Sequence, residues 1–410
     1  MTDNGVGQAD DLDPRPRVLH VITSFGRGGA ETMLLRLLLA SRDGPFHHGL
    51  ITLRDQATLL PTLKDAKIPA WSLEMPGLRV PGPALLRRFA HLVRDFRADL
   101  IQGWLYHGNL AALGAARLSG QRPPVLFNLR NTLYHLRQEP PLTRLAIRLG
   151  GRLSRRAVAV VHNAQLSVQH HARVGYAPAR AVVIPNGVDC REFAPDPAAR
   201  HAVRAELGLD PATPLIGRIC RFHPMKDHAG FLAAASRLLA AGHEAHFLLA
   251  GRGVGADNPH LQGWLRDCPA PERFHLLGER TDIARLNAAL DIAVSSSAWG
   301  EGFPNALAEA AACGVPCIAT DVGESARIVG PAGRVVAPGD VPALVAAMAE
   351  LLGSAALRRE LGRLGRERIV TGFSLPMAVA SYQELYRRVL AGETLEGPAG
   401  DVLADRQPHC

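Results

Sequence analysis

Residues 291–320 of the chain read DIAVSSSAWGEGFPNALAEAAACGVPCIAT. The apolar runs at its two ends, 291–295 and 316–320, have the length of buried strands, and the alanine-rich stretch between them, 305–313, has that of a helix. Strands that are joined through a helix in this way are parallel, and the helix covers one face of their sheet. The stretch therefore predicts a doubly wound α/β fold.

The same alternation continues on both sides of this unit and restarts after the turn Pro185-Asn186-Gly187. A chain of 410 residues is too long for one ordinary core and suits two domains. We therefore predict two doubly wound Rossmann-like domains that face a central cleft. The other predicted strands are 17–23, 47–53, 68–75, 99–105, 125–130, 157–162, 181–185, 215–221, 245–250, 273–277 and 334–337. The other predicted helices are 30–41, 83–96, 107–118, 140–153, 164–173, 227–241, 258–266, 282–290, 340–352, 354–371 and 376–391.

The domain boundaries follow from this pattern and from the polar ends of the chain. We expect a disordered leader at 1–14, an N-terminal domain at 15–187, a C-terminal domain at 188–374, a helix at 375–391 that crosses back to the N-terminal domain, and a flexible tail at 392–410.

Composition excludes several classes of protein. No apolar run approaches the roughly eighteen residues of a membrane span, and the leader lacks the pattern of a secretory signal. The six cysteines form neither a CxxC pair nor a cluster with histidine at metal-ligand spacing, so we expect no metal, no cofactor and a cytoplasmic location. The net charge is +8, but no basic stripe with interleaved aromatic residues points to nucleic acid.

Two acids frame the loop and helix in the middle of the opening stretch. Pro304 fits the first turn of a helix, which leaves the amides around Phe303 and Asn305 free to hold an anion. Eight residues at helical rise span at most about 12 Å, so Glu309 can reach a ribose while Glu301 reaches a sugar across a diphosphate. The alternative is a surface helix with two solvated acids, but a carboxylate inside an apolar helix is costly unless it is paired.

Basic and glycine-rich loops follow the first strand of each domain. Arg221 and Lys226 lie between a strand and a helix, where fixed cations can stabilise a departing diphosphate without a metal. The alternative is a basic helix start that pairs with surface acids. Gly28 and Gly29 belong to a strand-to-helix loop that can present bare amides to a phosphate, although a flexible turn is the other reading.

Polar residues also follow two strands of the first domain. His107 and Tyr106 come after the predicted strand 99–105, and Asn128 and Arg130 end the next strand, where they would line the acceptor side of a cleft. A lone histidine among seventeen is weak evidence, and ordinary core or surface roles are the alternative for these residues.

At these residues the chain resembles the family 4 glycosyltransferases, which have the GT-B fold, and more loosely the bacterial members that build surface polysaccharides. The resemblance implies that Arg221 and Lys226 hold the diphosphate of a UDP- or GDP-sugar, Glu309 the ribose, Glu301 the transferred sugar and His107 the reacting face. It also implies retention of the anomeric configuration without a metal. The remaining predicted donor-binding residues are Gly28, Gly29, Gly302, Phe303, Pro304 and Asn305.

The resemblance makes the N-terminal domain the acceptor side and the C-terminal domain the nucleotide-sugar side. One departure is Cys220, which stands before Arg221 where glycine is usual and puts the backbone course at that point in question. We expect transfer to a glycan or lipid-linked acceptor in polysaccharide or cell-envelope biosynthesis. The alternatives are a nucleotide-sugar hydrolase or epimerase of the same fold, and a non-catalytic protein that binds sugar nucleotides.

The arginines of the first domain suggest one further partner. Between Arg117 and Arg180 there are eleven arginines and a single acid, Glu139. Those of 144–156 recur at helical spacing with leucines between them, which predicts peripheral binding to an anionic membrane, at the inner face of the cytoplasmic membrane. The alternative is a solvated basic helix face, and Gly150-Gly151 predicts a break in the helix.

Overall fold

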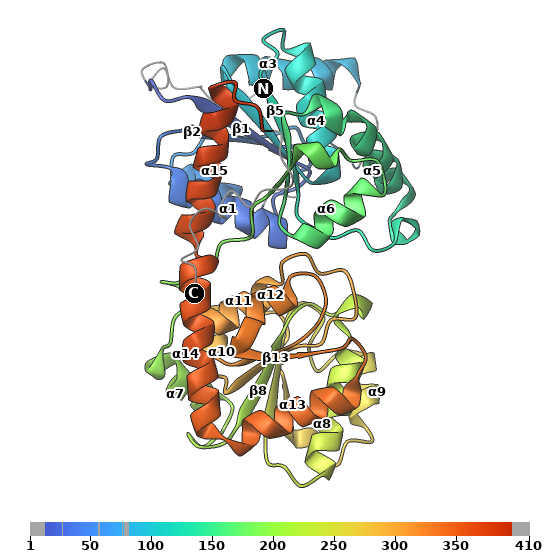
Figure 1. Ribbon diagram of the computed structural model, residues 1–410, viewed down its shortest axis with the longest axis vertical. Helices are drawn as coiled ribbons and strands as arrows, with labels where there is room; N and C mark the ends of the chain where they lie inside the picture. Colours follow the sequence, from blue (N-terminus) through green and yellow to red (C-terminus); the bar gives the residue numbers. More distant parts are fainter. Residues whose placement is uncertain (1–12, 27, 56–57, 76, 78–81, 396–410) are drawn as a thin grey trace.

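The computed structural model describes residues 13–26, 28–55, 58–75, 77 and 82–395, which form two lobes, one above the other in Figure 1. Positions 1–12 of the predicted leader, Arg27 of the glycine loop and positions 396–410 of the predicted tail lie outside these residues.

Each lobe is built on one parallel sheet. Within the described ranges the first sheet has the strand order β3-β2-β1-β4-β5-β6-β7, and the second has the order β10-β9-β8-β11-β12-β13. All pairs of neighbouring strands are parallel, as in β1 with β4 and β8 with β11. The first strand of each lobe lies at a switch point, beside which ligands of such sheets bind. The strands are β1 (Arg17–Ile22), β2 (His47–Thr52), β3 (Ala70–Ser72), β4 (Leu100–Trp104), β5 (Val125–Leu129), β6 (Ala159–His162), β7 (Ala181–Val183), β8 (Leu215–Ile219), β9 (His246–Ala250), β10 (Phe274–Leu276), β11 (Ile292–Ser295), β12 (Cys317–Thr320) and β13 (Gly333–Val336).

Helices cover both faces of each sheet, so the strands are buried on both sides. All residues of β1, β4 and β5 are buried, which explains why they read as continuous apolar runs. The helices are α1 (Gly29–Ser41), α2 (Leu60–Asp65), α3 (Pro83–Asp95), α4 (Leu105–Leu118), α5 (Pro141–Leu153), α6 (Gln165–Ala172), α7 (Pro197–Glu206), α8 (His228–Ala240), α9 (Pro259–Leu265), α10 (Ile283–Ala289), α11 (Asn305–Ala312), α12 (Ser325–Val329), α13 (Val341–Gly353), α14 (Ala355–Gly372) and α15 (Leu375–Leu390).

The last helix, α15, lies on the first lobe, whereas α14 lies on the second (Figure 1). Its buried Tyr382 and Leu385 share a core with Leu34 and Leu38 of α1. Burying large apolar side chains of this kind contributes roughly 1.5–3 kcal/mol each, so the packing holds α15 against the first sheet.

Two crossing segments connect the lobes and run side by side. The Val188 amide donates to the Phe373 carbonyl at 2.9 Å, and the Leu375 amide donates to the Val188 carbonyl at 2.7 Å. Gly187 is required here, because a Cβ at this position would lie 2.6 Å from Cα of Leu375. The lobes are therefore joined by a close-packed double crossing.

The predicted fold class is confirmed, but three helices were not predicted, namely α2, α7 and α12. The segment between Pro197 and the predicted strand 215–221 was not assigned to any helix or strand. Pro197 instead occupies the first turn, and Asp196 caps the helix by accepting a hydrogen bond from the Ala199 amide at 2.9 Å.

The break predicted at Gly150-Gly151 is wrong, because α5 is continuous there. Both glycines are buried, and a Cβ would lie 2.4 Å from Oη of Tyr176 at the first and 2.5 Å from the Val174 carbonyl oxygen at the second. The glycines let the helix approach the 174–176 segment closely.

None of the described helices is by itself long and apolar enough to cross a bilayer. Only α13 and α14 taken together reach that length and composition, and they are bent by 105° at the break between them.

Candidate functional site

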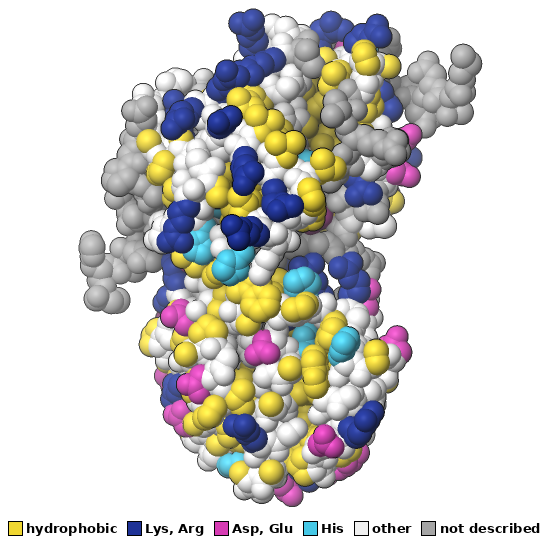
Figure 2. Space-filling model, turned by 90° about the vertical axis from the view of Figure 1, so that its right-hand side faces the viewer, with side chains coloured by type: hydrophobic (Ala, Val, Ile, Leu, Met, Phe, Trp, Pro, Cys, Tyr) yellow, Lys and Arg dark blue, Asp and Glu magenta, His cyan; other side chains and the backbone are white. Residues whose placement is uncertain are grey.

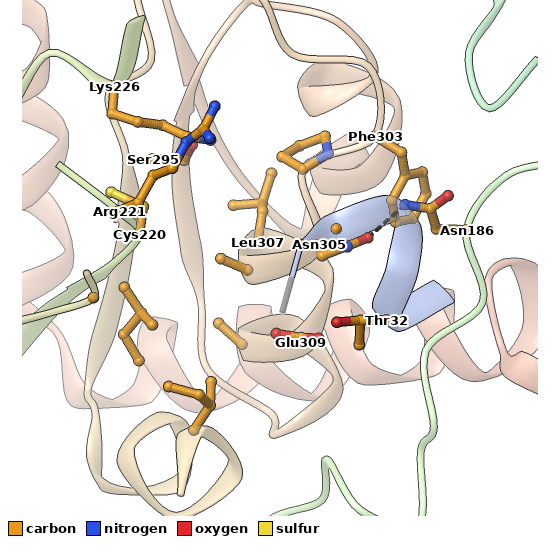
Figure 3. Close-up of a pocket in the computed structure, with 18 of the residues that line it drawn as sticks. Thr32, Asn186, Cys220, Arg221, Lys226, Ser295, Phe303, Asn305, Leu307 and Glu309 are labelled. Carbon is orange, nitrogen blue, oxygen red and sulfur yellow. Dashed lines mark hydrogen bonds between the residues drawn. The ribbon is translucent and has the colours of Figure 1, made fainter. Parts of the chain in front are cut away.

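A cleft of about 1000 Å³ lies between the two lobes. It is lined by the loops that follow β1, β8, β9, β10 and β11, together with parts of α1 and α11. Figure 3 shows Arg221 and Lys226 reaching in from one wall, with Phe303 and Asn305 opposite and Glu309 deeper along α11. The carboxyl ends of two sheets thus converge on one site, as expected for a ligand-binding crevice of such folds.

Lys226 and Glu301 form an ion pair in the cleft. Nζ of Lys226 contacts Oε1 of Glu301, and the Ser297 hydroxyl donates to the same oxygen at 2.6 Å. The lysine side chain is 18% exposed and the glutamate 8%, so the two charges are largely withdrawn from water and retain little freedom. A ligand phosphate that approaches Lys226 would share this cation with Glu301.

The backbone after Lys226 is held by an unusual cap. Asp227 has a left-handed conformation with φ of 48°, and its Oδ1 accepts a hydrogen bond from the Gly230 amide at 2.9 Å, which caps α8. Aspartate and asparagine tolerate this conformation better than most residues because their short side chains bond locally. The cap therefore fixes the direction in which the chain leaves the lysine.

Asp227→Ala is expected to lower the free energy of unfolding by about 1–2 kcal/mol. It removes the cap, and alanine has no side-chain hydrogen bond to offset the cost of the left-handed conformation. Asp227→Asn is expected to cost less than about 0.5 kcal/mol, because asparagine meets both needs. Urea unfolding measures both.

The matched control is Asp340→Ala, which removes the cap that Asp340 gives the Ala343 amide of α13, at a φ of −81°. It should lower the free energy of unfolding by about 1 kcal/mol, the contribution of the cap alone. An asparagine variant as unstable as Asp227→Ala would contradict this account.

Arg221 is exposed to the cleft and has no acidic partner among the described residues. Its one hydrogen bond there goes from Nη2 to the Met225 sulfur at 4.0 Å. The preceding Cys220 does not adopt a left-handed conformation; the residue that does is Gly251, where a Cβ would lie 2.1 Å from the Cys220 carbonyl oxygen. The cysteine therefore fits the backbone, because the close approach is accommodated by Gly251.

Glu309 lies on the face of α11 that borders the cleft and faces an arginine of the first lobe. Its Oε1 accepts a hydrogen bond from Nη1 of Arg36 at 2.9 Å, and its side chain is 12% exposed. Burial raises the pKa of Glu309, and the nearby Arg36 guanidinium opposes that shift. The acid is thus paired, as its apolar surroundings require.

The N-terminus of α11 lies against the first lobe and the connection between the lobes. Nδ2 of Asn186 donates to Oδ1 of Asn305 at 2.6 Å, and a Cβ at Gly29 would lie only 3.6 Å from Nδ2 of Asn305. Gly28 is the N-cap of α1 and Gly29 its first residue. The predicted glycine loop and the predicted anion-binding helix start therefore lie next to each other.

Arg130 borders the cleft, but its guanidinium is used inside the protein. Nη1 donates to the Tyr382 hydroxyl at 2.9 Å and to the Ile184 carbonyl at 3.2 Å, and Nη2 donates to Asn186. This buried arginine ties the first lobe, α15 and the connecting segment together. Its predicted role on the acceptor side of the cleft stays a prediction.

Tyr106 and Asn128, also predicted on the acceptor side, are not on the cleft surface. The Tyr106 hydroxyl bonds Nε2 of His171 at 2.9 Å, and Nδ2 of Asn128 donates to the Tyr382 hydroxyl at 3.0 Å. Both side chains are buried, so the structure places them in core hydrogen-bond networks.

His107 is not among the residues that line the cleft. It is half-buried, and burial lowers its pKa, so the imidazole is neutral near pH 7. Its Nε2 is buried without a partner among the described residues. A role at the reacting face stays a prediction.

Among the residues that line or organise the cleft and were missed by sequence reasoning are Arg36, Asn186, Phe193 and Ser297. The sequence pointed to Asn186, because it lies in the turn at which the alternation of strands and helices restarts. No feature of the sequence pointed to Arg36, since its partner Glu309 is 273 residues away in the chain. Among the described residues, no group of three or more His, Cys, Asp or Glu is placed to hold a metal ion.

Two parallel sheets that face a cleft between two lobes are the arrangement of the GT-B fold. Residues 27–192 match the family model described as Glycosyltransferase Family 4, and residues 213–354 match the one described as Glycosyl transferases group 1. The two matches cover both lobes, and the chain belongs to the family 4 type of GT-B glycosyltransferases.

Relatives agree with this assignment, and solved structures share the fold. The chain is 27% identical over 318 residues to a putative glycosyltransferase EpsF of Bacillus subtilis, a match that covers 74% of this chain and 79% of the relative. It is 29% identical to the lipopolysaccharide core biosynthesis mannosyltransferase LpsB of Rhizobium meliloti, over 51% of this chain and 61% of that one, so it spans less than two thirds of that relative. The structure of Anabaena Alr3699/HepE in complex with UDP-glucose superimposes with a TM-score of 0.78 at 20% identity, over 90% of this chain and 99% of that one.

Proposed function

We propose that the protein is a retaining, metal-independent glycosyltransferase that moves a hexose from a UDP- or GDP-sugar to a lipid-linked glycan acceptor in polysaccharide or cell-envelope biosynthesis. The observation that carries the proposal is the placement of Arg221 and Lys226 on one wall of the cleft and Glu309 on the other (Figure 3). One relative is named as a lipopolysaccharide core biosynthesis mannosyltransferase, and the name of another gives a diphosphoundecaprenol-linked acceptor, which supports the acceptor class. A neighbour solved with UDP-glucose supports the donor class.

In this proposal the donor lies along α11. Its ribose hydroxyls donate to Glu309, its diphosphate contacts Arg221 and Lys226, and its sugar hydroxyls donate to Glu301. The bond that breaks joins C1 of the sugar to the diphosphate oxygen, and negative charge then grows on the leaving diphosphate. Lys226, which is held by its ion pair with Glu301, and the exposed Arg221 beside it stabilise that charge.

Retention follows if the acceptor oxygen attacks C1 on the face from which the diphosphate departs. The proton of the acceptor hydroxyl then passes to a diphosphate oxygen, and the new bond forms as the old one breaks. Excess EDTA should leave the rate unchanged. Loss of turnover in EDTA that Mg²⁺ or Mn²⁺ restores would contradict a metal-free mechanism.

A nucleotide-sugar hydrolase or epimerase is the runner-up from the same fold, and a non-catalytic binding protein is a third reading. Thermal-shift screening with UDP-, GDP- and ADP-sugars identifies the donor. Nucleotide release that requires an acceptor supports transfer, whereas release in its absence favours hydrolysis. Donor-dependent stabilisation with no turnover under any acceptor would favour the binding protein.

We further propose that α5 holds the enzyme against an anionic membrane surface. Leu142, Leu145 and Leu149 are 55%, 62% and 44% exposed, and their i, i+3, i+7 spacing places them on one face of α5. Arg148 and Arg152 are exposed on the same helix, and Figure 2 shows cationic and apolar side chains mixed over this face of the upper lobe. Apolar residues flanked by arginines are typical of interfacial helices.

The chain is expected to sediment with phosphatidylglycerol vesicles at low salt, because each arginine near an anionic surface contributes roughly 1 kcal/mol. Binding should fall at least tenfold in the variant in which Arg148, Arg152, Arg155 and Arg156 become Ser. It should also weaken in high salt.

A control variant with the same net charge separates this surface from general electrostatic attraction. It replaces by Ser four exposed arginines that lie on other elements, namely Arg285, Arg359, Arg363 and Arg387. Vesicle binding of this variant should stay close to that of the wild type. Equal binding to neutral vesicles, or no binding to either kind, would contradict the membrane proposal.

A further inference from the structure

Arg36 reaches from the first lobe into the site proposed for the donor. It lies in the middle of α1, lines the cleft, and its side chain is only 17% exposed. Nη1 donates to Oε1 of Glu309 at 2.9 Å, and Nη2 lies 3.5 Å from Oε2 of Glu192. Two ion pairs from one guanidinium therefore join the lobes.

The guanidinium is held in place from a third direction. Its central carbon lies 5.2 Å from the centre of the Phe193 ring, which is within the range of a cation–π contact. Phe193 is buried in the core of the second lobe, so the ring is a fixed surface. A planar cation between an aromatic face and two acids has little freedom to rotate, which favours one orientation of Arg36.

The carboxylate needs this partner more than it would on a surface. Glu309 belongs to an alanine-rich helix whose Ala308 and Ala310 are buried. The other titratable groups that face it do not supply a positive charge: Glu192 raises its pKa further, and the Cys313 thiol, whose own pKa burial and then Glu309 raise to about 12, is neutral. Arg36 is thus the cation that balances Glu309.

The ion pair leaves part of the carboxylate free. Arg36 uses Oε1 only, and Oε2 accepts no hydrogen bond from the described residues. An ionised carboxylate has about four lone-pair positions, so a second donor can be accepted without breaking the pair. The remaining oxygen is the one available to a ligand in the cleft.

We propose that Arg36 is a positioning residue of the donor site, which fixes the Glu309 carboxylate through Oε1 and leaves Oε2 to accept the ribose hydroxyls. The inference rests on the proposed function, because it takes Glu309 as the ribose-binding acid. It adds that donor binding depends on the first lobe: the ribose contact is correctly set only when α1 lies against α11.

Titration calorimetry with UDP and with GDP tests the inference on the full chain. Arg36→Met is expected to raise the Kd of the bound nucleotide roughly tenfold at pH 8, the size of one lost charged hydrogen bond. Arg36→Lys should recover part of the affinity, since lysine restores the positive charge but not the planar, several-donor geometry of the guanidinium. In a Glu309→Gln background, Arg36→Met should change Kd less than twofold, because the two residues act as one unit.

A pH profile separates positioning from a merely structural role. Without Arg36 the pKa of Glu309 rises, so a growing share of the acid is protonated as the pH falls and binds the ribose hydroxyls less well. The ratio of the Kd of Arg36→Met to that of the wild type should therefore be larger at pH 6 than at pH 8. The titration of the nucleotide phosphate cancels in this ratio.

The control is Arg42→Met, at the C-terminal end of the same helix, where the arginine is 54% exposed and pairs with Asp43. It should leave Kd unchanged, and thermal unfolding checks that every variant is folded. A folded Arg36→Met with wild-type affinity at both pH values, or a pH-independent ratio, overturns the inference while the proposed function stands. A wild type that binds neither UDP nor GDP contradicts the proposed donor site itself, and the inference with it.

Discussion

Replacing Lys226 by alanine is expected to lower kcat by about 10² or more, the usual cost of removing one preorganised stabiliser of developing charge. The lysine is partly buried and paired with Glu301, whose Oε1 the Ser297 hydroxyl also holds, so it is already fixed before the donor binds. Charge on the leaving diphosphate is greater in the transition state than in the ground state, so kcat should fall more than substrate binding weakens. Steady-state kinetics with the donor found by thermal shift measure both.

The chain offers a matched control, because it contains only three lysines. Lys64→Ala removes an exposed lysine of α2 and should leave kcat unchanged. Arg221→Ala should behave like Lys226→Ala, since the arginine is exposed to the same wall of the cleft. A folded Lys226→Ala enzyme with near-wild-type kcat would remove the lysine from the reaction.

The second large effect is expected for Glu309→Ala, which should raise the Kd of the donor nucleotide by roughly 10- to 100-fold. A ribose contact is equally strong in the ground and transition states, so kcat at saturating donor should change much less than Kd. The substitution leaves the Arg36 guanidinium unpaired on one side, and Glu192 remains within its reach. Titration calorimetry gives Kd directly.

Two comparisons make this result specific. Glu192→Ala removes the other acid near Arg36, which is 53% exposed, and should change Kd little. Glu309→Gln should lie between wild type and alanine, since one amide oxygen can still accept a hydrogen bond. An unchanged Kd in Glu309→Ala would take this acid out of the site.

The fold could be predicted because its signal is local. Strands buried on both faces are apolar along their whole length, and capped helices separate them. The alternation of strands and helices can therefore be recognised in 291–320 and in the segments on either side. The helix α7 was missed although Asp196 and Pro197 form a good capped start. Proline in a first turn favours a helix, and this signal was not used.

The site could be predicted only in part. Glu301, Arg221 and Lys226 follow strands and Glu309 lies within α11, and the structure brings all four to one cleft. The pairing of Glu309 with Arg36 depends on how two lobes meet, which no local pattern encodes.

The contacts of Asn128 and Arg130 in the first lobe could not be predicted, because a position after a strand does not fix the direction of a side chain. Asn128 turns into the core toward Tyr382, and Arg130 is used to hold the connection between the lobes. Both bond the Tyr382 hydroxyl of α15, more than 250 residues away in the chain. Sequence placed these residues near the edge of the sheet but could not show what they contact.

Hydrogen–deuterium exchange of the full chain with UDP-, GDP- and ADP-sugars tests the central claim most directly, namely that a nucleotide sugar binds between the lobes along α11. The account predicts that at least one donor slows exchange of the amides of 301–309 and 221–228 together, and that Glu309→Ala weakens this protection. Binding that protects a different surface, or no protection by any of the three donors, would contradict it.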